Sequence, residues 1–452
     1  MKKRLAWFTP LPPVRSGISQ YSIELIPTLS QNYEIDIFVN SQEDLLFSKS
    51  ALNILDAHDF IHKHAQDPYA LIIYQMGNAP CHAYMWPYLV QYPGLVVLHD
   101  ANLHHSRART LLQEGRPDDY RTEFFYNHPS APSGVAELGL NGLLGSLYYL
   151  WPMRQIILDA SRTILVHNSW LANIIRQERP TLPVEVVEMG VPAPESKENA
   201  ESRLREIHHI DKDAVLLTAF GKITPEKRIS QILRSLAASN THEHPWHLLL
   251  CGESVEHYNA EQEASNLGIG DQVSVTGYVS DDQISDYLTA SDIGLCLRWP
   301  SARETSASWL RFLAAGKPTI ITDLSHLSEI PSLDPRNWQL TSGPTNSGSQ
   351  SEPICISIDI VDEEHSLSLA LSRLCIDATL RDTLGKASHN YWKNHFNLEQ
   401  MRSGYVQTIE NTCTFDNNSE TKKRLPKHLF QNGTEHFRSL LKEIGATDEL
   451  DI

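Results

Sequence analysis

Three basic residues follow an apolar run near the middle of the chain. Lys222, Lys227 and Arg228 lie in the sequence FGKITPEKRI, directly after the run 214–220. If that run is a buried parallel strand, these cations lie at its carboxyl end, where open α/β sheets bind diphosphates. Solvated surface side chains are the ordinary alternative. The formal net charge of the chain is −17, so this local excess of positive charge favours an anion site for Lys222 and Lys227, whereas both interpretations stay open for Arg228.

A glycine near the amino terminus has the setting of a second ligand-binding turn. Gly17 lies in PLPPVRSGIS, between the apolar run 5–9 and a helix predicted to begin at about Ile18. Glycine lets the backbone approach a ligand, and a helix N-terminus offers free amides and a positive dipole to an anion. A simple strand-to-helix turn is the alternative. Neither this turn nor the one after residue 220 has the GxGxxG pattern, which argues against a nicotinamide-dependent dehydrogenase.

A third polar loop contains one carboxylate and two hydroxyl side chains. Glu304, Thr305 and Ser306 follow an apolar run that ends at Leu297, and a helix is predicted from about Thr305 to Ala315. Hydroxyls and free amides at such a helix start can bind an anion. Glu304 is suited to accept hydrogen bonds from sugar hydroxyls. The alternative is a carboxylate that only stabilises the start of the helix.

Histidines gather after the apolar run 95–99. A lone histidine is more often structural than functional. His99 and Asp100, however, end this run beside the predicted mouth of the first sheet, and this position favours a functional histidine. His104 and His105 have no cysteine or carboxylate at ligand spacing, so we predict that they are loop or acceptor-side residues and that the protein has no metal site.

Short apolar runs separated by helical patterns predict the elements that position these residues. The runs lack polar–apolar alternation, as expected for parallel strands buried on both faces. Helices between them imply right-handed βαβ units, and the runs fall into two sets, which predicts two α/β domains with parallel sheets. The first set comprises residues 5–9, 35–39, 70–74, 95–99, 163–167 and 184–188, and the second comprises residues 214–220, 247–251, 272–276, 293–297, 318–322 and 354–358.

The composition between the two sets predicts a linker. Proline and charged residues are dense at 190–205, just before the second set begins, as is typical of a domain boundary. The predicted organisation is a first domain at residues 1–192 with an insert at about 101–150, a second domain at 193–390, a closing helix at 391–412, and a polar tail at 413–452 that is an appended helix or partly disordered.

Bulk composition excludes several classes of protein. The 452 residues suffice for two domains, and 41% hydrophobic with 21% charged residues is typical of a folded soluble protein. The net negative charge argues against nucleic acid as a partner. Six scattered cysteines without CxxC pairs favour buried reduced thiols. No signal peptide and no apolar run of roughly 20 residues is found, so we expect a cytoplasmic protein, with peripheral contact to the inner face of a membrane left open.

Taken together, these segments resemble the family-4 retaining glycosyltransferases of the GT-B fold, also described as glycosyl transferases group 1. The likeness covers residues 1 to about 410. It rests on PLPPVRSGISQYS, VVLHD, FGKITPEKR, VTGYVSDDQISDYLTASDIGLCL and RWPSARETSASWLRFLAAGKP. The resemblance implies two Rossmann-like domains whose parallel sheets face one another across a cleft.

The resemblance also implies roles for individual residues. In this family the glycine loop and the Gly-Lys segment hold the diphosphate of a nucleotide sugar, roles that fall on Gly17, Gly221, Lys222 and Lys227. The glutamate that approaches the donor sugar matches Glu304. His99 is the expected contact to the donor sugar or the acceptor hydroxyl, with Asp100 as the alternative.

One position departs from the family pattern. A second glutamate usually follows the first after seven residues and binds the nucleotide ribose. Here that place is taken by Arg311, and the spacing is one residue shorter. Arg311 contacts phosphate or faces solvent, and recognition of the ribose by a carboxylate is in question.

The function implied is transfer of a sugar from a nucleotide-diphosphate sugar, with retention of anomeric configuration and without a metal or other cofactor. The acceptor expected from the family is a lipid-linked glycan or a growing polysaccharide. Two alternatives stay open: a nucleotide-sugar epimerase on the same architecture, and a catalytically weak sugar-nucleotide-binding subunit of a partner enzyme, which the missing glutamate keeps under consideration.

Overall fold

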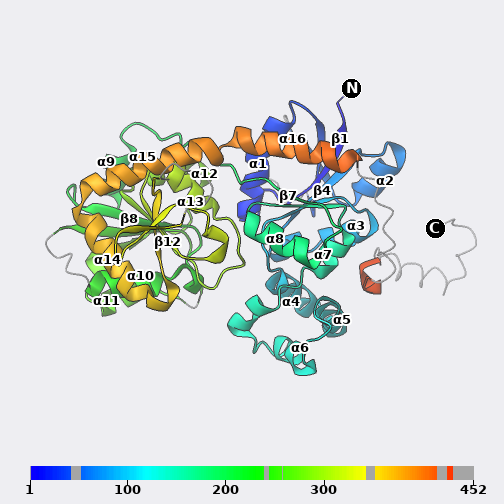
Figure 1. Ribbon diagram of the computed structural model, residues 1–452, viewed down its shortest axis with the longest axis horizontal. Coiled ribbons are helices and arrows are strands. Elements are labelled where there is room, and N and C mark those ends of the chain that lie inside the picture. Colours follow the sequence, from blue (N-terminus) through cyan, green and yellow to red (C-terminus); the bar gives the residue numbers. More distant parts are fainter. Residues whose placement is uncertain are drawn as a thin grey trace, which may run out of the picture. The chain divides into compact units, whose positions relative to one another are not determined.

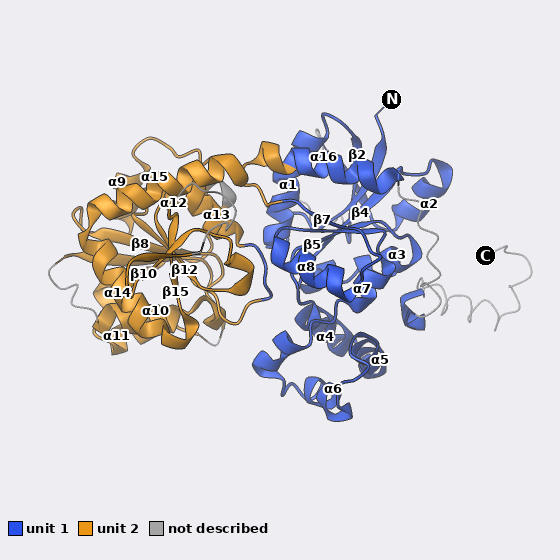
Figure 2. Cartoon of the chain, in the orientation of Figure 1, with its two compact units in different colours: residues 1–187, 302–305, 402–452 blue, residues 188–301, 306–401 orange. Residues whose placement is uncertain are grey.

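The chain forms two compact units (Figure 2). Unit 1 comprises residues 1–187, 302–305 and 402–452, and unit 2 comprises residues 188–301 and 306–401. The computed structural model describes residues 2–41, 52–238, 244–256, 258–342, 352–414 and 425–430. The first change of unit therefore comes after residue 187, whereas the sequence placed the domain boundary after residue 192.

Unit 1 contains a parallel sheet of seven strands in the order β3-β2-β1-β4-β5-β6-β7. All neighbours in it run parallel. Consecutive residues of β1 face opposite sides, so that Trp7 stacks on Tyr405 and Phe8 stacks on Tyr74. The strands are β1 (Arg4–Phe8), β2 (Glu34–Val39), β3 (Asn53–Asp56), β4 (Leu71–Met76), β5 (Leu95–Leu98), β6 (Thr163–Val166) and β7 (Val184–Val186).

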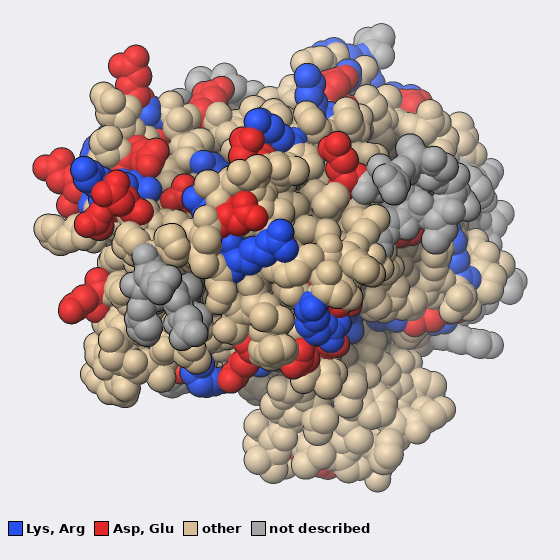
Figure 3. Space-filling model, turned by 60° about the vertical axis from the view of Figure 1, so that its left-hand side comes forward, with Lys and Arg blue, Asp and Glu red and all other residues tan. Residues whose placement is uncertain are grey.

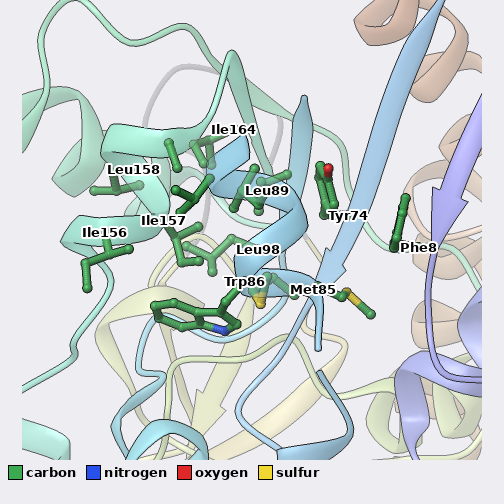
Figure 4. Close-up of a cluster of buried hydrophobic side chains, with 14 of the residues drawn as sticks. Phe8, Tyr74, Met85, Trp86, Leu89, Leu98, Ile156, Ile157, Leu158 and Ile164 are labelled. Carbon is green, nitrogen blue, oxygen red and sulfur yellow. The ribbon is translucent and has the colours of Figure 1, made fainter. Parts of the chain in front are cut away.

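Helices cover this sheet (Figure 1). Apolar side chains of α3 and α7 interdigitate with those of β4, β5 and β6 in one buried cluster, part of which is drawn in Figure 4. The helical elements of unit 1 are α1 (Gly17–Leu29), α2 (Asp59–Gln66), η1 (Pro80–His82), α3 (Met85–Gln91), α4 (His104–Gln113), α5 (Pro117–Asn127), α6 (Ser133–Leu140), η2 (Gly145–Leu150), α7 (Gln155–Ala160), α8 (Ser169–Glu178), most of α16 (Leu398–Thr414) and η9 (Lys427–Phe430).

The insert predicted at about 101–150 is a small helical lobe made of α4, α5, α6 and η2 (Figure 1). It has a hydrophobic cluster of its own, in which Leu111, Tyr120, Phe124 and Met153 are fully buried. This cluster explains why a segment rich in histidine, tyrosine and glycine is ordered here.

Unit 2 contains a sheet of eight strands in the order β10-β9-β8-β11-β12-β15-β13-β14. Its neighbours are parallel except β13 and β14, which are antiparallel. The strands are β8 (Val215–Phe220), β9 (Trp246–Cys251), β10 (Val273–Val275), β11 (Ile293–Cys296), β12 (Thr319–Thr322), β13 (Ser332–Asp334), β14 (Gln339–Ser342) and β15 (Cys355–Ile358).

Two hydrophobic clusters hold the helices of unit 2 on its sheet. The helical elements are α9 (Ala200–Ile207), η3 (Pro225–Lys227), α10 (Ile229–Ala238), α11 (Ala260–Asn266), η5 (Gly270–Gln272), α12 (Asp281–Ala290), α13 (Ala307–Ala314), η6 (Ser325–Leu327), η7 (Ile360–Asp362), α14 (Glu363–Ile376) and α15 (Ala378–His395).

The two parallel α/β sheets predicted from the apolar runs are confirmed, and all twelve predicted runs coincide with strands. Three strands were not predicted: β3, β13 and β14. Each lies toward an edge of its sheet and shows partial exposure, so none has the fully apolar run of a central strand.

The carboxyl-terminal part differs from the prediction in detail. The helix expected at 391–412 is divided, because α15 ends at His395 and α16 begins at Leu398. Asn397 starts the new helix, since its side chain accepts a hydrogen bond from the backbone N–H of Gln400 at 2.9 Å. Of the predicted tail, only residues 425–430 lie within the described part beyond Thr414, and Leu429 is buried against unit 1.

Candidate functional site

Each sheet has a central place where the strand order reverses at the first strand of its unit. In unit 1 this is at β1, which lies between β2 and β4, and in unit 2 it is at β8, which lies between β9 and β11. Ligands of open α/β sheets bind outside the carboxyl ends of the strands at such a place. The loops that leave β1 and β8 there are the ones that carry Gly17 and Lys222.

The loop after β8 approaches its neighbour so closely that it requires glycine. The Gly221 N–H donates to Cys251 O at 2.8 Å, and the backbone has φ +100°. A Cβ at Gly221 would lie 3.0 Å from Lys227 Nζ, and a Cβ at Gly252 would lie only 2.2 Å from Gly221 O. The two glycines therefore let the loops after β8 and β9 pass each other, and Gly221 leaves space for the Lys227 ammonium.

The Lys227 side chain folds back over the carboxyl end of β8, the strand that precedes it. Its ammonium donates a hydrogen bond to Phe220 O. The backbone carbonyl of the preceding residue, Glu226, accepts a hydrogen bond from the Trp299 N–H at 2.7 Å, which ties this turn to the loop after β11. Burial raises the pKa of the Cys296 thiol to about 12, and the positive charge of the nearby Lys227 acts in the opposite direction. The ammonium is thus held at the carboxyl ends of β8 and β11, and Lys222 is exposed on the same loop.

Arg228 has a partner that the sequence did not indicate. Its guanidinium makes hydrogen bonds to both carboxylate oxygens of Glu363, with Nε–Oε1 at 2.8 Å and Nε–Oε2 at 3.1 Å. The Glu363 side chain is 6% exposed. A buried carboxylate needs this cation, so the geometry supports a structural role for Arg228, which joins the turn after β8 to the start of α14.

The third predicted segment starts a helix slightly later than expected. Ser306 is the N-cap of α13, and its Oγ accepts from the Trp309 N–H at 3.3 Å. The helix begins at Ala307, so Thr305 lies one residue before the cap rather than inside the helix. Arg311 lies in the last turn of α13, where a cation complements the helix dipole.

Residues 302–305 group with unit 1, although the chain on both sides belongs to unit 2. The Ala101 N–H donates to Ala302 O at 2.8 Å, and the Arg303 guanidinium lies 5.5 Å from the centre of the Trp170 ring. Burial lowers the pKa of Arg303, and the neighbouring Glu304 acts in the opposite direction. Glu304 itself is half-buried.

His99 lies inside unit 1 and is largely enclosed. Its Nε2 is 2.7 Å from Gln75 Oε1, and its ring packs edge-on against Tyr21, with centroids 4.8 Å apart. Burial, with the nearby His167 and His82, lowers the pKa of His99 well below its usual value. The neutral imidazole that results can donate a hydrogen bond from one nitrogen and accept at the other, but it carries no charge near neutral pH.

Asp100 is used by the backbone of the next loop. Its Oδ2 accepts a hydrogen bond from the Asn78 N–H at 2.6 Å, and a Cβ at Gly77 would lie 3.3 Å from the same oxygen. Asp100 therefore fixes the loop that follows β4. This contact gives Asp100 a structural task in unit 1.

Two further buried histidines surround His99, and the sequence analysis did not single them out. His82 Nδ1 lies 2.9 Å from Gln75 O, and His167 Nδ1 lies 2.8 Å from Val187 O. Burial lowers the pKa of each to about 4. Their Nε2 atoms, and Gln75 Nε2, make no hydrogen bond within the described structure. No local pattern marks these residues, because they come from separate segments and meet only in the folded sheet.

Gly17 is the first residue of α1, and the Ser16 side chain caps this helix by accepting from the Ile18 N–H at 3.3 Å. A Cβ at Gly17 would meet nothing within 4 Å in unit 1. Packing inside the unit therefore does not require glycine here, which leaves a ligand as a reason for it.

The histidine pair of the insert is engaged with tyrosines. His104 Nε2 lies 2.8 Å from Tyr120 Oη, and His105 packs against the rings of Tyr148 and Tyr149. The described residues hold no group of three or more side chains placed to bind a metal ion.

A cavity of about 720 Å³ opens in unit 1 beside the loop after β1. Its lining includes the apolar Leu11 and Val14 from that loop, the polar Thr110 and Gln113 of α4, and the charged Arg107, Glu114 and Arg116. Its volume and mixed lining are typical of a small-molecule site. His428 also lines it, held 2.8 Å from the buried Glu123, so that part of the predicted tail takes part in this lining.

Comparisons with known proteins agree with this architecture. Residues 200–332 match the family model of glycosyl transferases group 1. This part runs from α9 to β13 and includes Lys222, Lys227 and Glu304. The expected family, glycosyl transferases group 1, is thereby supported.

One curated relative is the alpha-monoglucosyldiacylglycerol synthase of Streptococcus pneumoniae (strain ATCC BAA-255 / R6), which is 24% identical over 220 residues, or 48% of this chain and 47% of that protein. The chain thus spans about half the length of this relative.

Solved structures extend the likeness over almost the whole chain. A glycosyltransferase from Rickettsia africae ESF-5 has a TM-score of 0.61 at 13% identity, covering 92% of this chain and 100% of that one. Anabaena Alr3699/HepE in complex with UDP-glucose has a TM-score of 0.59 at 12% identity, covering 90% and 99%. WaaG, a glycosyltransferase involved in lipopolysaccharide biosynthesis, has a TM-score of 0.57 at 13% identity, covering 90% and 99%. The GT-B fold predicted from the sequence is confirmed.

Proposed function

We propose that this protein is a retaining glycosyltransferase of family 4 that transfers a hexosyl group from a nucleotide-diphosphate sugar to an acceptor hydroxyl. The observation that carries the proposal is the loop after β8. It lies in the segment that matches the glycosyl transferases group 1 model, and Gly221 leaves room there for the Lys227 ammonium at the end of two parallel strands.

Lys222 and Lys227 bind the diphosphate and stabilise the charge that builds up on it when the anomeric C–O bond breaks. Fixed donors of this kind are worth about 3 kcal/mol each in acyl-transfer enzymes, so two lysines supply a large part of the needed stabilisation without a metal. Gly17 and the N-terminus of α1 contribute backbone amides, and Ser306 and Thr305 contribute a second set at α13. Arg228 holds Glu363 and positions the turn.

Glu304 accepts hydrogen bonds from the hydroxyls of the donor sugar. His99 contacts the same sugar or the acceptor hydroxyl as a neutral imidazole, oriented by Gln75. Asp100 supports the neighbouring loop through the Asn78 amide. The acceptor hydroxyl attacks the face that the diphosphate leaves, which preserves the anomeric configuration.

Two related proteins suggest which substrates to try first. Anabaena Alr3699/HepE was solved with UDP-glucose, and the streptococcal relative is named for a glucosyl diacylglycerol. We therefore propose UDP-glucose as donor, a lipid-linked acceptor, and a location at the cytoplasmic face of a membrane. In the part of the chain that the structure describes, no helix is long and apolar enough to cross a membrane.

The test is a panel of nucleotide sugars, each assayed for release of the nucleoside diphosphate with and without diacylglycerol or polyprenyl phosphate acceptors. We expect release that depends on the acceptor and continues in the presence of EDTA, with the anomeric configuration of the product, read by NMR, equal to that of the donor. Conversion of the donor sugar without acceptor would instead identify an epimerase. Binding of the donor without turnover on any acceptor would favour a subunit that acts with a partner enzyme.

A further inference from the structure

The insert of unit 1 exposes a group of leucines that its own packing does not use. Leu138, Leu143, Leu147 and Leu150 are 39%, 67%, 46% and 67% exposed. They lie within α6, the following turn and η2, and we refer to these four residues as the leucine tip. Leu144, which lies between Leu143 and Leu147, is only 2% exposed. The segment therefore has one leucine that faces the interior, next to others that face solvent.

Charge is nearly absent around the leucine tip. Residues 129–153 contain a single charged residue, Glu137. Its carboxylate accepts two hydrogen bonds from Arg121, at 2.7 and 3.0 Å. The space-filling view shows the lower lobe almost free of acidic and basic side chains on the visible face, whereas charges of both signs are scattered over the surface above it (Figure 3).

A cavity of about 350 Å³ lies beside the leucine tip. Its lining includes Gly139, Leu140 and Gly142, which lie between members of the tip, together with Leu112 and Tyr148. His105, Ser106 and Arg109 of α4 add polar groups to the lining. Asn78 and Pro80 also line it, from the loop that Asp100 fixes at the carboxyl end of β4. The cavity therefore extends from the segment that carries the tip to the loop after β4.

We infer that the leucine tip inserts into the surface of a phospholipid bilayer. Three properties favour a bilayer over a protein partner. Protein interfaces gain most of their affinity from tryptophan, tyrosine and arginine, and leucine is under-represented among such residues. A specific protein interface also has a polar rim, and here the segment 129–153 that carries the tip has Glu137, paired with Arg121, as its only charged residue. Exposed leucines in a segment that also contains the half-buried aromatic residues Tyr148, Tyr149 and Trp151 have the composition of segments that insert into the interfacial region of a membrane.

The insert is built to present the leucine tip in a fixed conformation. Phe124 and Met153 belong to its private core, and Tyr120 is hydrogen-bonded to His104. Because this core holds the tip in place before binding, little conformational entropy is lost when leucines enter the bilayer. The inference deepens the proposed location at a membrane by naming the residues that enter the bilayer, and vesicle binding can be measured without the transfer reaction.

The charge pattern predicts which lipids bind. The tip carries no cation for anionic headgroups, and the whole chain has a formal net charge of −17. Attraction therefore comes from apolar burial, so binding to neutral phosphatidylcholine vesicles is expected to equal or exceed binding to vesicles that contain phosphatidylglycerol. Raising the salt from about 0.1 M to about 1 M shortens the Debye length from ~10 Å to ~3 Å and is expected not to release the protein.

The test is co-sedimentation of the full chain with phosphatidylcholine vesicles. A variant with Leu143→Ser, Leu147→Ser and Leu150→Ser is expected to lower the vesicle partition coefficient by at least about tenfold. The matched control carries Ile61→Ser, Ile207→Ser and Val361→Ser, which remove apolar residues that are 42%, 58% and 92% exposed elsewhere, and is expected to bind like the wild type. Replacing the same three leucines by phenylalanine is expected to retain binding, which guards against loss of fold in the serine variant.

Several outcomes would overturn the inference. The first is that the wild type does not bind vesicles. The second and third are that the serine variant binds as well as the wild type, or that the control variant loses as much binding as the serine variant. The fourth is an oligomer in vesicle-free buffer that the serine substitutions dissociate, which would make a second copy of the chain the partner. UDP-glucose turnover in the same samples separates the two proposals. Membrane binding without any use of nucleotide sugars would refute the proposed function alone, and turnover without vesicle binding would refute only the leucine tip.

Discussion

Replacing Lys227 by methionine tests the proposed phosphate site most directly. Methionine keeps much of the apolar stem of lysine and removes the ammonium that now donates to Phe220 O. A hydrogen bond from a charged donor contributes about 1.5–3 kcal/mol to the free energy of unfolding, which is less than the stability of a typical domain, so the fold is expected to persist with a lower melting temperature. The change is thus directed at the charge and spares the packing around it.

The expected loss of activity follows from the charge and its setting. A lysine about 4 Å from a phosphate charge, at an effective dielectric constant of about 20, contributes about 4 kcal/mol. Lys227 is half-buried, so screening by water reduces this to about 2 kcal/mol at the lower limit. Since 1.36 kcal/mol is tenfold in rate, kcat/KM is expected to fall between about 30-fold and about 1000-fold.

The assay is acceptor-dependent release of UDP from UDP-glucose, measured over a range of donor concentrations. The matched control is Lys212→Met, which removes an exposed lysine of the same unit outside the loop after β8 and is expected to leave kcat/KM unchanged. Lys227→Arg, which restores a cation at the same place, is expected to recover part of the activity. A kcat/KM for Lys227→Met within about threefold of the wild type, with the fold intact, would show that this ammonium does not bind the diphosphate.

Three other predictions follow from single contacts in the structure. Arg228→Ala leaves the buried Glu363 without its cation and is expected to lower the free energy of unfolding by about 3–5 kcal/mol. Adding Glu363→Gln is expected to recover much of this loss. Urea titration measures both variants, and an unaltered midpoint for Arg228→Ala would contradict the structural role of the pair. The methyl group added by Gly17→Ala meets no atom of unit 1, so this variant is expected to raise the free energy of unfolding by about 0.5–1 kcal/mol. Turnover is expected to fall, because only a ligand would contact the new methyl group. Unchanged kinetics would remove Gly17 from the site. His167 has a pKa of about 4 in the folded protein, below its value in the unfolded chain, so the unfolded state takes up the proton first as the pH falls below about 6.5. The free energy of unfolding is therefore expected to be about 2 kcal/mol lower at pH 5 than at pH 8. In thermal melts, the melting temperature of His167→Gln should fall less steeply with decreasing pH than that of the wild type, and parallel curves would contradict the assignment.

Strands and the loops that follow them were accessible from the sequence because their signals are local. A strand buried on both faces must be apolar throughout, so the runs that became β1 and β8 stand out without any knowledge of their neighbours. Parallel βαβ connections then place the residues after each run at the same edge of the sheet. That is why Lys222 and Lys227 could be assigned to a carboxyl-terminal loop before the fold was seen.

Contacts between distant segments were decided only by the tertiary structure. Arg228 and Glu363 are 135 positions apart, and nothing near either residue indicates the pair that takes Arg228 out of the set of free cations. His99 and Gln75 meet because β4 and β5 are neighbours, which turns a candidate catalytic histidine into a buried, neutral one.

The same distinction holds for the edges of the fold. Strands β3 and β13 and the antiparallel β14 form because an adjacent strand offers free backbone groups to pair with, and their own residues are too mixed to predict it. The insert could be recognised by its composition and position, but its private core and the outward leucines depend on how α4, α5 and α6 pack. Local patterns specify which segments are buried, whereas the strand order and the helix packing determine which side chains meet, and for long-range pairs that information is spread over the whole chain.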